Sequence, residues 1–300
     1  MTARPLLGSE VLASIRASVN ETLEAYLEAC SADLADRDPR ATLLVEEISR
    51  LVHAGGKRLR PAFCVLGFRA AGGADRAANR HVRQPVVRVA SALELLHTMA
   101  LIHDDLVDDA SERRGVPSSA SRLADLAADR GFPGDPARFG RSAALLAGDL
   151  AAVLADRLML TSGCDPEALT RALVPYHEMR LDMAAGQLLD VAGLASEHDT
   201  ALRAARLKGG SYTVEGPLQV GAALAGERED VREVLGSFGA PLGEAFQLRD
   251  DLLDREGAHG VTPADVNELV GRAREALRSP PIEPDAAAAL DELATLVAMR

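Results

Sequence analysis

The stretch ELLHTMALIHDDLVDD, residues 94–109, decides the expected fold. Its apolar residues recur at the spacing of an α-helix, which predicts a helix with a broad buried face. Four aspartates close the stretch, and Arg113 and Arg114 follow shortly after them. Carboxylates at this density repel one another. Either positive groups balance them, or they form only a solvated helix end.

The same helical period continues along the chain, and no convincing alternating strand interrupts it. Ala, Leu, Glu and Arg, which favour helices, fill the long segments. Glycine and proline clusters separate these segments, for example GFPGDP at 131–136 and TSGCDP at 161–166. The pattern predicts an all-α fold of about ten or more helices, packed side by side in a single domain over residues 1–300. Residues 1–8 are expected to be flexible.

Composition limits the possible functions. Hydrophobic residues make up 47% of the 300 and aromatic residues only 3%, so aliphatic side chains must form the core. The net charge of −12 argues against nucleic acid as a partner, because a phosphate backbone needs a basic surface. The cysteines lie far apart without a CxxC pair, and a cytoplasmic location is expected. MTARPLLGSE does not read as a signal peptide, and no apolar run is judged to approach the ~18 residues of a membrane span.

Two segments carry the same DDxxD pattern, LIHDDLVDD at 101–109 and FQLRDDLLDRE at 246–256. At about 100° per residue, the three aspartates of each pattern lie within roughly a 100° arc of one helix. Oxygen-only ligands suit Mg²⁺, which accepts one or two carboxylates and takes its other ligands from water and substrate phosphates. The candidate metal ligands are Asp104, Asp105, Asp108, Asp250, Asp251 and Asp254.

A single DDxxD in an acidic protein is usually an exposed helix face. Here there are two, and each ends a strongly apolar helix, LELLHTMALI or LGEAFQL. Such flanks favour carboxylates at the mouth of a cavity over carboxylates on an open surface. We therefore interpret both patterns as functional.

A basic segment, GGKRLRP at 55–61, places Lys57, Arg58 and Arg60 after a Gly-Gly turn at a predicted helix start. Helix N-termini and planar guanidinium groups both favour phosphate. Alone, the segment would be a solvated basic turn. Together with Arg113 and Arg114 and two acidic sets, it indicates two phosphorylated groups, one bound through metal and one bound directly.

These motifs together resemble the trans-prenyl diphosphate synthases, also called polyprenyl synthetases. The similarity runs from about residue 40 to residue 256 and is closest to geranylgeranyl diphosphate synthases. It rests on several motifs in the family's order, namely GGKRLRP, ELLHTMALIHDDLVDD with its trailing RRGVPS, AGDLA at 147–151, GQLLD at 186–190, KGGSYTVEGPLQVGAAL at 208–224 and FQLRDDLLD.

The resemblance implies an isoprenoid synthase fold with a central cavity, a homodimer, and a prenyltransferase that adds isopentenyl diphosphate to an allylic diphosphate. The two aspartate motifs would face each other across the cavity mouth. They would hold Mg²⁺, about three ions per active site with substrate bound, on the allylic diphosphate.

The resemblance also assigns roles to single residues. Catalysis would depend on Asp104, Asp105, Asp108, Asp250, Asp251 and Lys208. The allylic diphosphate would be bound by Arg113, Gln187, Lys208 and Gln247. Isopentenyl diphosphate would be bound by Lys57, Arg60, His97 and Arg114. The helical wheel agrees for His97, which lies about two turns before Asp104 on nearly the same stripe.

The growing chain should run down the helix that carries the first aspartate motif. Ala100 lies one turn deeper than Asp104, and Leu96 follows one turn below it. Short-chain members of the family often have an aromatic residue in this region, whereas Met99 and Ala100 are not aromatic. Geranylgeranyl diphosphate is therefore the favoured product, although residues of other helices could set the floor of the pocket.

The resemblance ends after Asp254. The family continues there with a glycine- and lysine-bearing loop and further helices, but this sequence has no lysine after Lys208. Residues 255–300 therefore look shortened. Either the protein lacks the loop, or the sequence joins segments on both sides of a missing stretch, which is the favoured interpretation.

Three other functions remain open. A class I terpene cyclase shares the fold but usually has a different second metal motif and does not need Lys57 and Arg60. A non-catalytic subunit of a heteromeric prenyl synthase would usually lose aspartates from one motif. A phosphohydrolase of the HD type could use His103 and Asp104 with another histidine, but this leaves the second aspartate motif unexplained.

Overall fold

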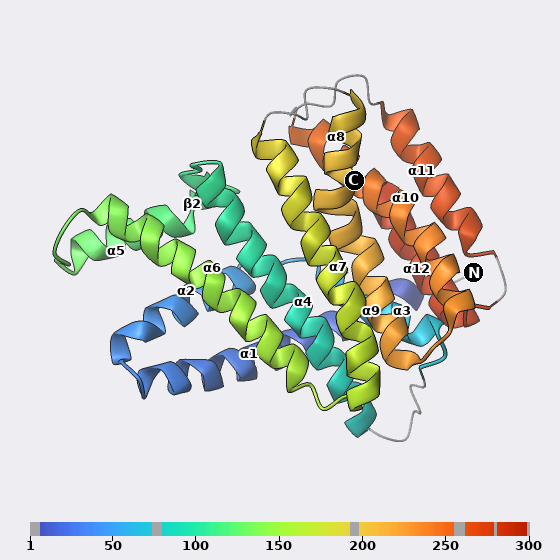
Figure 1. Ribbon diagram of the computed structural model, residues 1–300, viewed down its shortest axis with the longest axis horizontal. Coiled ribbons are helices and arrows are strands. Elements are labelled where there is room, and N and C mark those ends of the chain that lie inside the picture. The colour runs from blue at the N-terminus through green and yellow to red at the C-terminus, as the bar shows by residue number, and fades with distance from the viewer. Residues whose placement is uncertain (1–6, 74–79, 193–197, 255–261, 279–280, 299–300) are drawn as a thin grey trace, which may run out of the picture. The chain divides into compact units, whose positions relative to one another are not determined.

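The computed structural model describes residues 7–73, 80–192, 198–254, 262–278 and 281–298, and these are almost entirely helical (Figure 1). The expected all-α class is confirmed. The first helix, α1 (Leu7–Ala35), begins inside the segment that we expected to be flexible.

The contacts divide the chain into two compact units. Helices α1 and α4 (Arg80–Val107) contribute residues to both. Unit 1 comprises Met1–Ala17, Leu59–Ala90 and Ser162–Arg300, and unit 2 comprises Ser18–Arg58 and Ser91–Thr161. The single domain over residues 1–300 stays a prediction.

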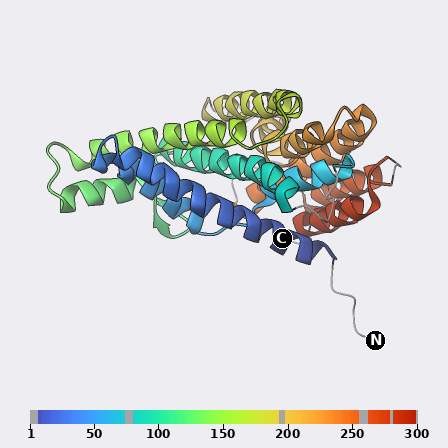
Figure 2. The ribbon, with the colours of Figure 1, turned by 90° about the horizontal axis from the view of Figure 1, so that it is seen from below.

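Unit 2 contains the later parts of α1 and α4, together with η1 (Pro39–Ala41), α2 (Thr42–His53), β1 (Glu112–Arg113), β2 (Val116–Pro117), α5 (Ser119–Asp129) and α6 (Pro136–Leu160). Helices α5 and α2 both contact α6, and α5 runs beside it (Figures 1 and 2). A Cβ at Gly140 of α6 would lie 2.2 Å from the carbonyl oxygen of Ala120, so this close approach requires glycine. The core is formed by Leu43, Ile102, Leu123, Ala143, Ala144 and Ala147.

Unit 1 contains α3 (Leu59–Ala70), α7 (Pro166–Val191), α8 (His198–Ala205), η3 (Arg206–Glu215), α9 (Gly216–Ala225), α10 (Glu229–Asp254), α11 (Pro263–Ala276) and α12 (Pro284–Ala298). Its aliphatic core draws on α3 and on η3 through α12. Helix α10 contacts η3, which precedes it in the chain, and α11, which follows it (Figure 1).

The predicted breaks between helices coincide with capped helix starts. Asp135 accepts hydrogen bonds from the backbone N–H groups of Ala137 and Arg138 at 3.1 and 3.3 Å, and Pro136 opens α6. Asp165 caps α7 in the same way, again followed by proline. These caps satisfy N–H groups that lack a partner inside the helix, and proline there loses no helical bond.

One segment corrects the expectation about membrane spans. Within the described residues, Gln84–Val107 of α4 has the length and apolar composition of a span, with a mean hydropathy of 1.4. Of its apolar window, 67% is buried inside the protein. This is the behaviour of a core helix, so it is only weak evidence for a membrane.

Candidate active site

The first aspartate motif spans the end of α4, with Asp104 and Asp105 in its last turn and Asp108 just beyond its last residue, Val107. Asp109 has a φ of 49°, the left-handed conformation that ends many helices. The N–H of Ala110 bonds to the carbonyl of Asp105 at 2.9 Å, and the N–H of Asp109 to that of Leu106 at 3.4 Å. This pair of bonds is a Schellman motif, which turns the chain back toward the helix it has left.

A hairpin that the sequence analysis missed follows this stop. Strands β1 and β2 pair antiparallel around a two-residue turn of Arg114 and Gly115, with φ values of 54° and 76°. Positive φ at both central positions defines a type I′ turn, which suits hairpins. The Arg-Gly dipeptide was the one sequence signal for this turn. It was too weak to predict a hairpin, because strands of two residues each show no alternating pattern.

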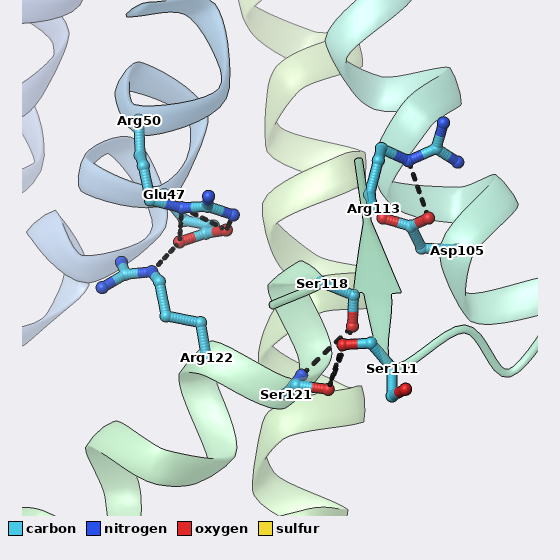
Figure 3. A network of polar contacts seen from close by, with 8 residues as sticks. All are labelled: Glu47, Arg50, Asp105, Ser111, Arg113, Ser118, Ser121 and Arg122. Atoms are coloured by element: carbon cyan, nitrogen blue, oxygen red, sulfur yellow. Dashed lines mark hydrogen bonds and ion pairs between the residues drawn. The ribbon is translucent and has the colours of Figure 1, made fainter. Parts of the chain in front are cut away.

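The hairpin carries Arg113 back onto the aspartate motif, and Figure 3 shows its contact with Asp105. Its Nε donates to Oδ1 of Asp105 at 2.7 Å, and its Nη2 donates to Oδ2 of Asp104 at 3.0 Å. One guanidinium thus bridges two neighbouring carboxylates. Arg113 is therefore a positive group that balances the motif.

Asp105 is the buried member of the motif, with a side chain 5% exposed, whereas Asp104 is partly exposed and Asp108 is exposed. Burial raises the pKa of Asp105 above its ordinary value. Arg113 lowers this pKa, but not enough to offset burial, and the neighbouring aspartates raise it further. The three side chains therefore meet different environments although they belong to one motif.

Serine side chains close the base of the hairpin (Figure 3). The carbonyl of Ser111 accepts one hydrogen bond from the N–H of Ser118 and one from the hydroxyl of Ser121, both at 2.9 Å. Ser118 is also the N-cap of α5, since its hydroxyl accepts from the N–H of Ser121. The start of α5 and the base of the hairpin are thus one hydrogen-bonded unit.

Helix α5 is in turn tied to α2 through Glu47, whose side chain is fully buried (Figure 3). Its carboxylate accepts from Nη2 of Arg50 at 2.6 Å and from Nε of Arg122 at 2.5 Å. Burial raises the pKa of Glu47, but the bonds from Arg50 and Arg122 outweigh it, so the pKa lies below its ordinary value. Nothing in the sequence singled out Glu47, because its arginine partner on α5 is 75 residues away.

The basic segment divides into residues with different roles. Lys57 is exposed, as a phosphate ligand would be. Arg58 is buried and donates from Nη1 to Oε1 of Glu94 at 2.6 Å. It also bonds Asn20 and the carbonyl of Val52, so Arg58 serves the fold, and it is not among the residues that the resemblance assigns to isopentenyl diphosphate.

Arg60, at the start of α3, is partly buried beside η3 of the same unit. Its Nη2 donates to the hydroxyl of Thr213 at 2.7 Å, and its guanidinium lies 4.6 Å from the ring centre of Tyr212. The buried Nε has no hydrogen-bond partner among the described residues. Thr213 and Tyr212 belong to the KGGSYTVEGPLQVGAAL motif, but their contact with Arg60 was not predicted.

Three predicted ligands of the allylic diphosphate come from α7, η3 and α10 of unit 1. A Cβ at Gly186 would lie 2.5 Å from the backbone nitrogen of Lys208, so α7 meets η3 directly beside Gln187. A Cβ at Gly209 would lie 2.1 Å from Oε1 of Gln247, which brings α10 to the same place. The structure therefore brings together the segments that carry Gln187, Lys208 and Gln247.

Lys208 donates from Nζ to Oδ2 of Asp190, the last residue of GQLLD, at 2.7 Å. The segment around it, η3, is wound as a π-helix. Such windings are rare and are frequent at functional sites. Sequence reasoning identified Lys208 and the motif of Asp190, but neither the pair nor the π-helix.

The second aspartate motif is only partly described. Asp250 is exposed in the last turns of α10. The side chains of Asp251 and Asp254 lie outside the described residues. The first motif belongs to unit 2 and the second to unit 1, so their expected approach across a cavity stays a prediction.

The other predicted residues of α4 vary in burial. Leu96 is fully buried, whereas His97, Met99 and Ala100 are partly exposed. The exposed Arg114 occupies the hairpin turn.

The HD-type alternative gains no support from His103. Its Nε2 lies 3.3 Å from the carbonyl of Leu145 and 3.7 Å from a carboxylate oxygen of Asp149, both on α6. Nδ1 of His53 faces the carbonyl of Ser49 at 2.8 Å. Within the described part of the chain, no three His, Cys, Asp or Glu side chains form a group able to hold a metal by themselves.

The first motif nevertheless suits Mg²⁺. Its donors are all carboxylate oxygens, and Asp104 and Asp105 already share one cation, the guanidinium of Arg113. Mg²⁺ needs only one or two carboxylates when water and phosphate supply its other ligands, so a closed cage of protein ligands is not required.

Comparison with known proteins points to one family. Residues 41–264 match the Polyprenyl synthetase family. The chain is 31% identical over 233 residues to a geranylfarnesyl diphosphate synthase of Aeropyrum pernix, which covers 76% of this chain and 66% of the relative. It is 29% identical to a geranylgeranyl pyrophosphate synthase of Geoglobus acetivorans, covering 83% of this chain and 68% of that protein. The chain thus spans about two thirds of the length of these curated relatives.

A solved structure supports the same assignment. The fold resembles that of a geranylgeranyl pyrophosphate synthase from Corynebacterium glutamicum, crystallised with isoprenyl diphosphate and magnesium. The TM-score is 0.86 at 27% sequence identity, and the match covers 95% of this chain and 98% of that one.

Proposed function

This chain belongs to the polyprenyl synthetase family, the trans-prenyl diphosphate synthases, and we propose that it condenses isopentenyl diphosphate with an allylic diphosphate in a Mg²⁺-dependent reaction. The product is a trans-prenyl diphosphate one isoprene unit longer. The observation that carries the proposal is the meeting at η3 of the segments that carry Gln187, Lys208 and Gln247, which are far apart in sequence.

The aspartates of both motifs would hold Mg²⁺, which, when bound, stabilises the negative charge on departing pyrophosphate. Lys208 and Arg113 would orient the allylic diphosphate and add further positive charge beside it. Both cations rest on carboxylates in the structure, at 2.7 Å from Asp190 and from Asp105. Carboxylates therefore position both side chains until a diphosphate exchanges for them.

Lys57, Arg60, His97 and Arg114 are the proposed ligands of isopentenyl diphosphate. Arg60 is fixed by Thr213 and by the ring of Tyr212, which supports a role in holding one anion in a defined place. The double bond of isopentenyl diphosphate attacks the allylic cation that forms as pyrophosphate leaves. Loss of a proton then completes the reaction. No protein nucleophile is needed, and the apolar core of the family's fold serves to exclude water from the cation.

Geranylgeranyl diphosphate is the proposed product. Ala100 is small, Met99 is flexible, and neither is aromatic, so the stripe below Asp104 leaves room for a longer chain. The two curated relatives differ in their named products, so the family alone does not decide the chain length. Introducing Ala100→Phe should shorten the product to farnesyl diphosphate, as measured by mass.

A cytoplasmic homodimer is the proposed form of the enzyme. Helix α6 carries large apolar side chains on its exposed side, each about half exposed or more: Leu145, Leu146, Val153 and Leu160. A second copy would remove this surface from water. Light scattering of the purified protein should give twice the chain mass.

The test of the proposed function is pyrophosphate release from farnesyl diphosphate with and without isopentenyl diphosphate. A synthase needs both substrates, whereas a terpene cyclase would release pyrophosphate from the allylic substrate alone. A non-catalytic subunit would release none. Asp104→Asn is the matched control, since it removes one metal ligand and should abolish release.

A further inference from the structure

We propose that Arg113 is an internal counter-ion of the first aspartate motif and that it weakens the binding of a divalent cation there until a diphosphate draws Arg113 away. The inference rests on the proposed function for the identity of the site. It adds a reason why metal and diphosphate would bind together rather than independently.

The geometry of Arg113 is the first step. It uses two different nitrogens for two different carboxylates, Nε for Asp105 at 2.7 Å and Nη2 for Asp104 at 3.0 Å. Charge-assisted hydrogen bonds of this kind are among the stronger polar contacts of proteins. The bridge therefore balances the repulsion between neighbouring carboxylates without any metal.

The second step is competition. The carboxylates that hold Arg113 are those that would bind the metal. A divalent cation placed on the same oxygens would stand a few ångströms from the guanidinium, and like charges at that range repel. Without a diphosphate, a metal ion must therefore either displace Arg113 or bind beside it against electrostatic repulsion. Either way, Arg113 lowers the affinity of the substrate-free protein for metal.

The third step is release. The Arg113 side chain is 25% exposed, so it can leave the carboxylates without opening the core. A diphosphate offers several charged oxygen acceptors, so a guanidinium can donate two parallel hydrogen bonds to it as it does to carboxylates. When the diphosphate takes Arg113, this cation no longer competes with metal for Asp104 and Asp105. Reciprocity then requires that metal and diphosphate strengthen each other's binding.

The hairpin explains why Arg113 rather than Arg114 bridges Asp104 and Asp105. Residues 111 and 118 are joined by a backbone hydrogen bond, and the hydroxyl of Ser121 binds the same carbonyl of Ser111. This clamp and the type I′ turn hold Arg113 over α4, while the neighbouring Arg114 occupies the exposed turn. Arg114 carries the same charge in the same hairpin and is therefore a close control.

The experiment measures binding of Mn²⁺ alone to the full chain by the electron paramagnetic resonance signal of the free ion. Arg113→Gln should bind Mn²⁺ about tenfold more tightly than the wild type, as expected for the loss of two charge-assisted bonds at a partly exposed site. Arg114→Gln should stay within about twofold of the wild type, since it removes charge without removing the bridge. Equal shifts in both variants, or no tightening in Arg113→Gln, would overturn the inference.

Two further measurements keep the result clear. Inorganic pyrophosphate should raise the Mn²⁺ affinity of the wild type severalfold more than that of Arg113→Gln, and equal increases would contradict the coupling.

Ser121→Ala loosens the hairpin without removing a charge. It should tighten Mn²⁺ binding by less than Arg113→Gln does, and Ser121→Thr should restore the wild-type value. None of these depends on turnover, so a chain without synthase activity that shows the Arg113 effect would count against the proposed function alone.

Discussion

Arg58 and Glu94 form a buried ion pair in unit 2, with Nη1 of Arg58 2.6 Å from Oε1 of Glu94. Their side chains are 5% and 7% exposed. Arg58 also has a φ of 52°, a strained conformation for a non-glycine residue, which the surrounding bonds must maintain. The middle cation of GGKRLRP thus joins the segment to α4 and to the end of α2.

Removing one partner of this pair should therefore destabilise the fold. Glu94→Gln leaves the charge of Arg58 buried without a counter-charge and should lower the free energy of unfolding by about 3 kcal/mol, measured by urea denaturation. The control is Glu275→Gln, which breaks an exposed pair with Arg278 and should cause no measurable change. If both variants unfold at the same urea concentration as the wild type, the pair has no structural role.

The basic segment shows what sequence reasoning can and cannot separate. Residue type and position predicted a turn followed by a helix start, and α3 begins at Leu59 as expected. Charge alone could not distinguish Arg58 from its neighbours, because the difference lies in burial and in a partner 36 residues away. Long-range pairing of this kind leaves no local pattern in the sequence.

The candidate active site also contains features that the sequence predicts and features that it does not. The helical period and the aspartate spacing predicted where the motif of α4 lies, and the resemblance named Lys208, Gln187 and Gln247 before the structure brought their segments together. The clamp of Ser111 by Ser121 was missed, because a hairpin with strands of two residues has no alternating pattern to detect. The close helix contacts at glycine residues were missed for a related reason. A glycine in the sequence does not indicate which other helix will pack against it.

Close packing of α3 on α9 provides a stability test. A Cβ at Gly221 would lie 1.9 Å from the carbonyl oxygen of Cys64, a backbone atom that cannot move without separating the helices. Gly221→Ala should therefore cost about 3 kcal/mol of unfolding free energy, as overpacking does. Gly271→Ala on α11, where nothing lies within 4 Å, should instead stabilise by up to about 1 kcal/mol. Thermal unfolding of both variants measures the difference, and a stable Gly221→Ala would refute this packing.

Glu47 predicts a specific dependence of stability on pH. Its pKa is lowered in the folded protein from the ordinary 4.5, so it stabilises the fold above that pH. The contribution is lost as pH falls through the lower pKa of the folded state, where the carboxylate takes up a proton. Glu47→Gln should thus be much less stable than the wild type at pH 7, and the gap should close below pH 4.5. Glu46→Gln, at the exposed neighbouring position, should show no such convergence, and parallel curves for Glu47→Gln would exclude the proposed linkage.

Thr213 should control the affinity for isopentenyl diphosphate through Arg60. Its hydroxyl accepts a hydrogen bond from Nη2 of Arg60 at 2.7 Å, and Thr213 is itself buried, so the bond is shielded from water. Thr213→Val keeps the branched shape but removes the acceptor, which leaves Arg60 free to rotate away from the diphosphate. One bond to a charged group corresponds to roughly a tenfold rise in KM for isopentenyl diphosphate. Since Arg60 is a proposed ligand of isopentenyl diphosphate and not of the allylic diphosphate, KM for the allylic substrate and kcat should change by less than about twofold.

The matched variant for this prediction is Thr213→Ser, which retains the hydroxyl and should stay close to the wild type. Steady-state kinetics with each substrate varied in turn separates the two Michaelis constants. A purely structural role for Thr213 would instead lower the unfolding temperature and affect both substrates alike. An equal rise in both KM values, with no recovery in Thr213→Ser, would show that the contact with Arg60 does not orient a substrate ligand.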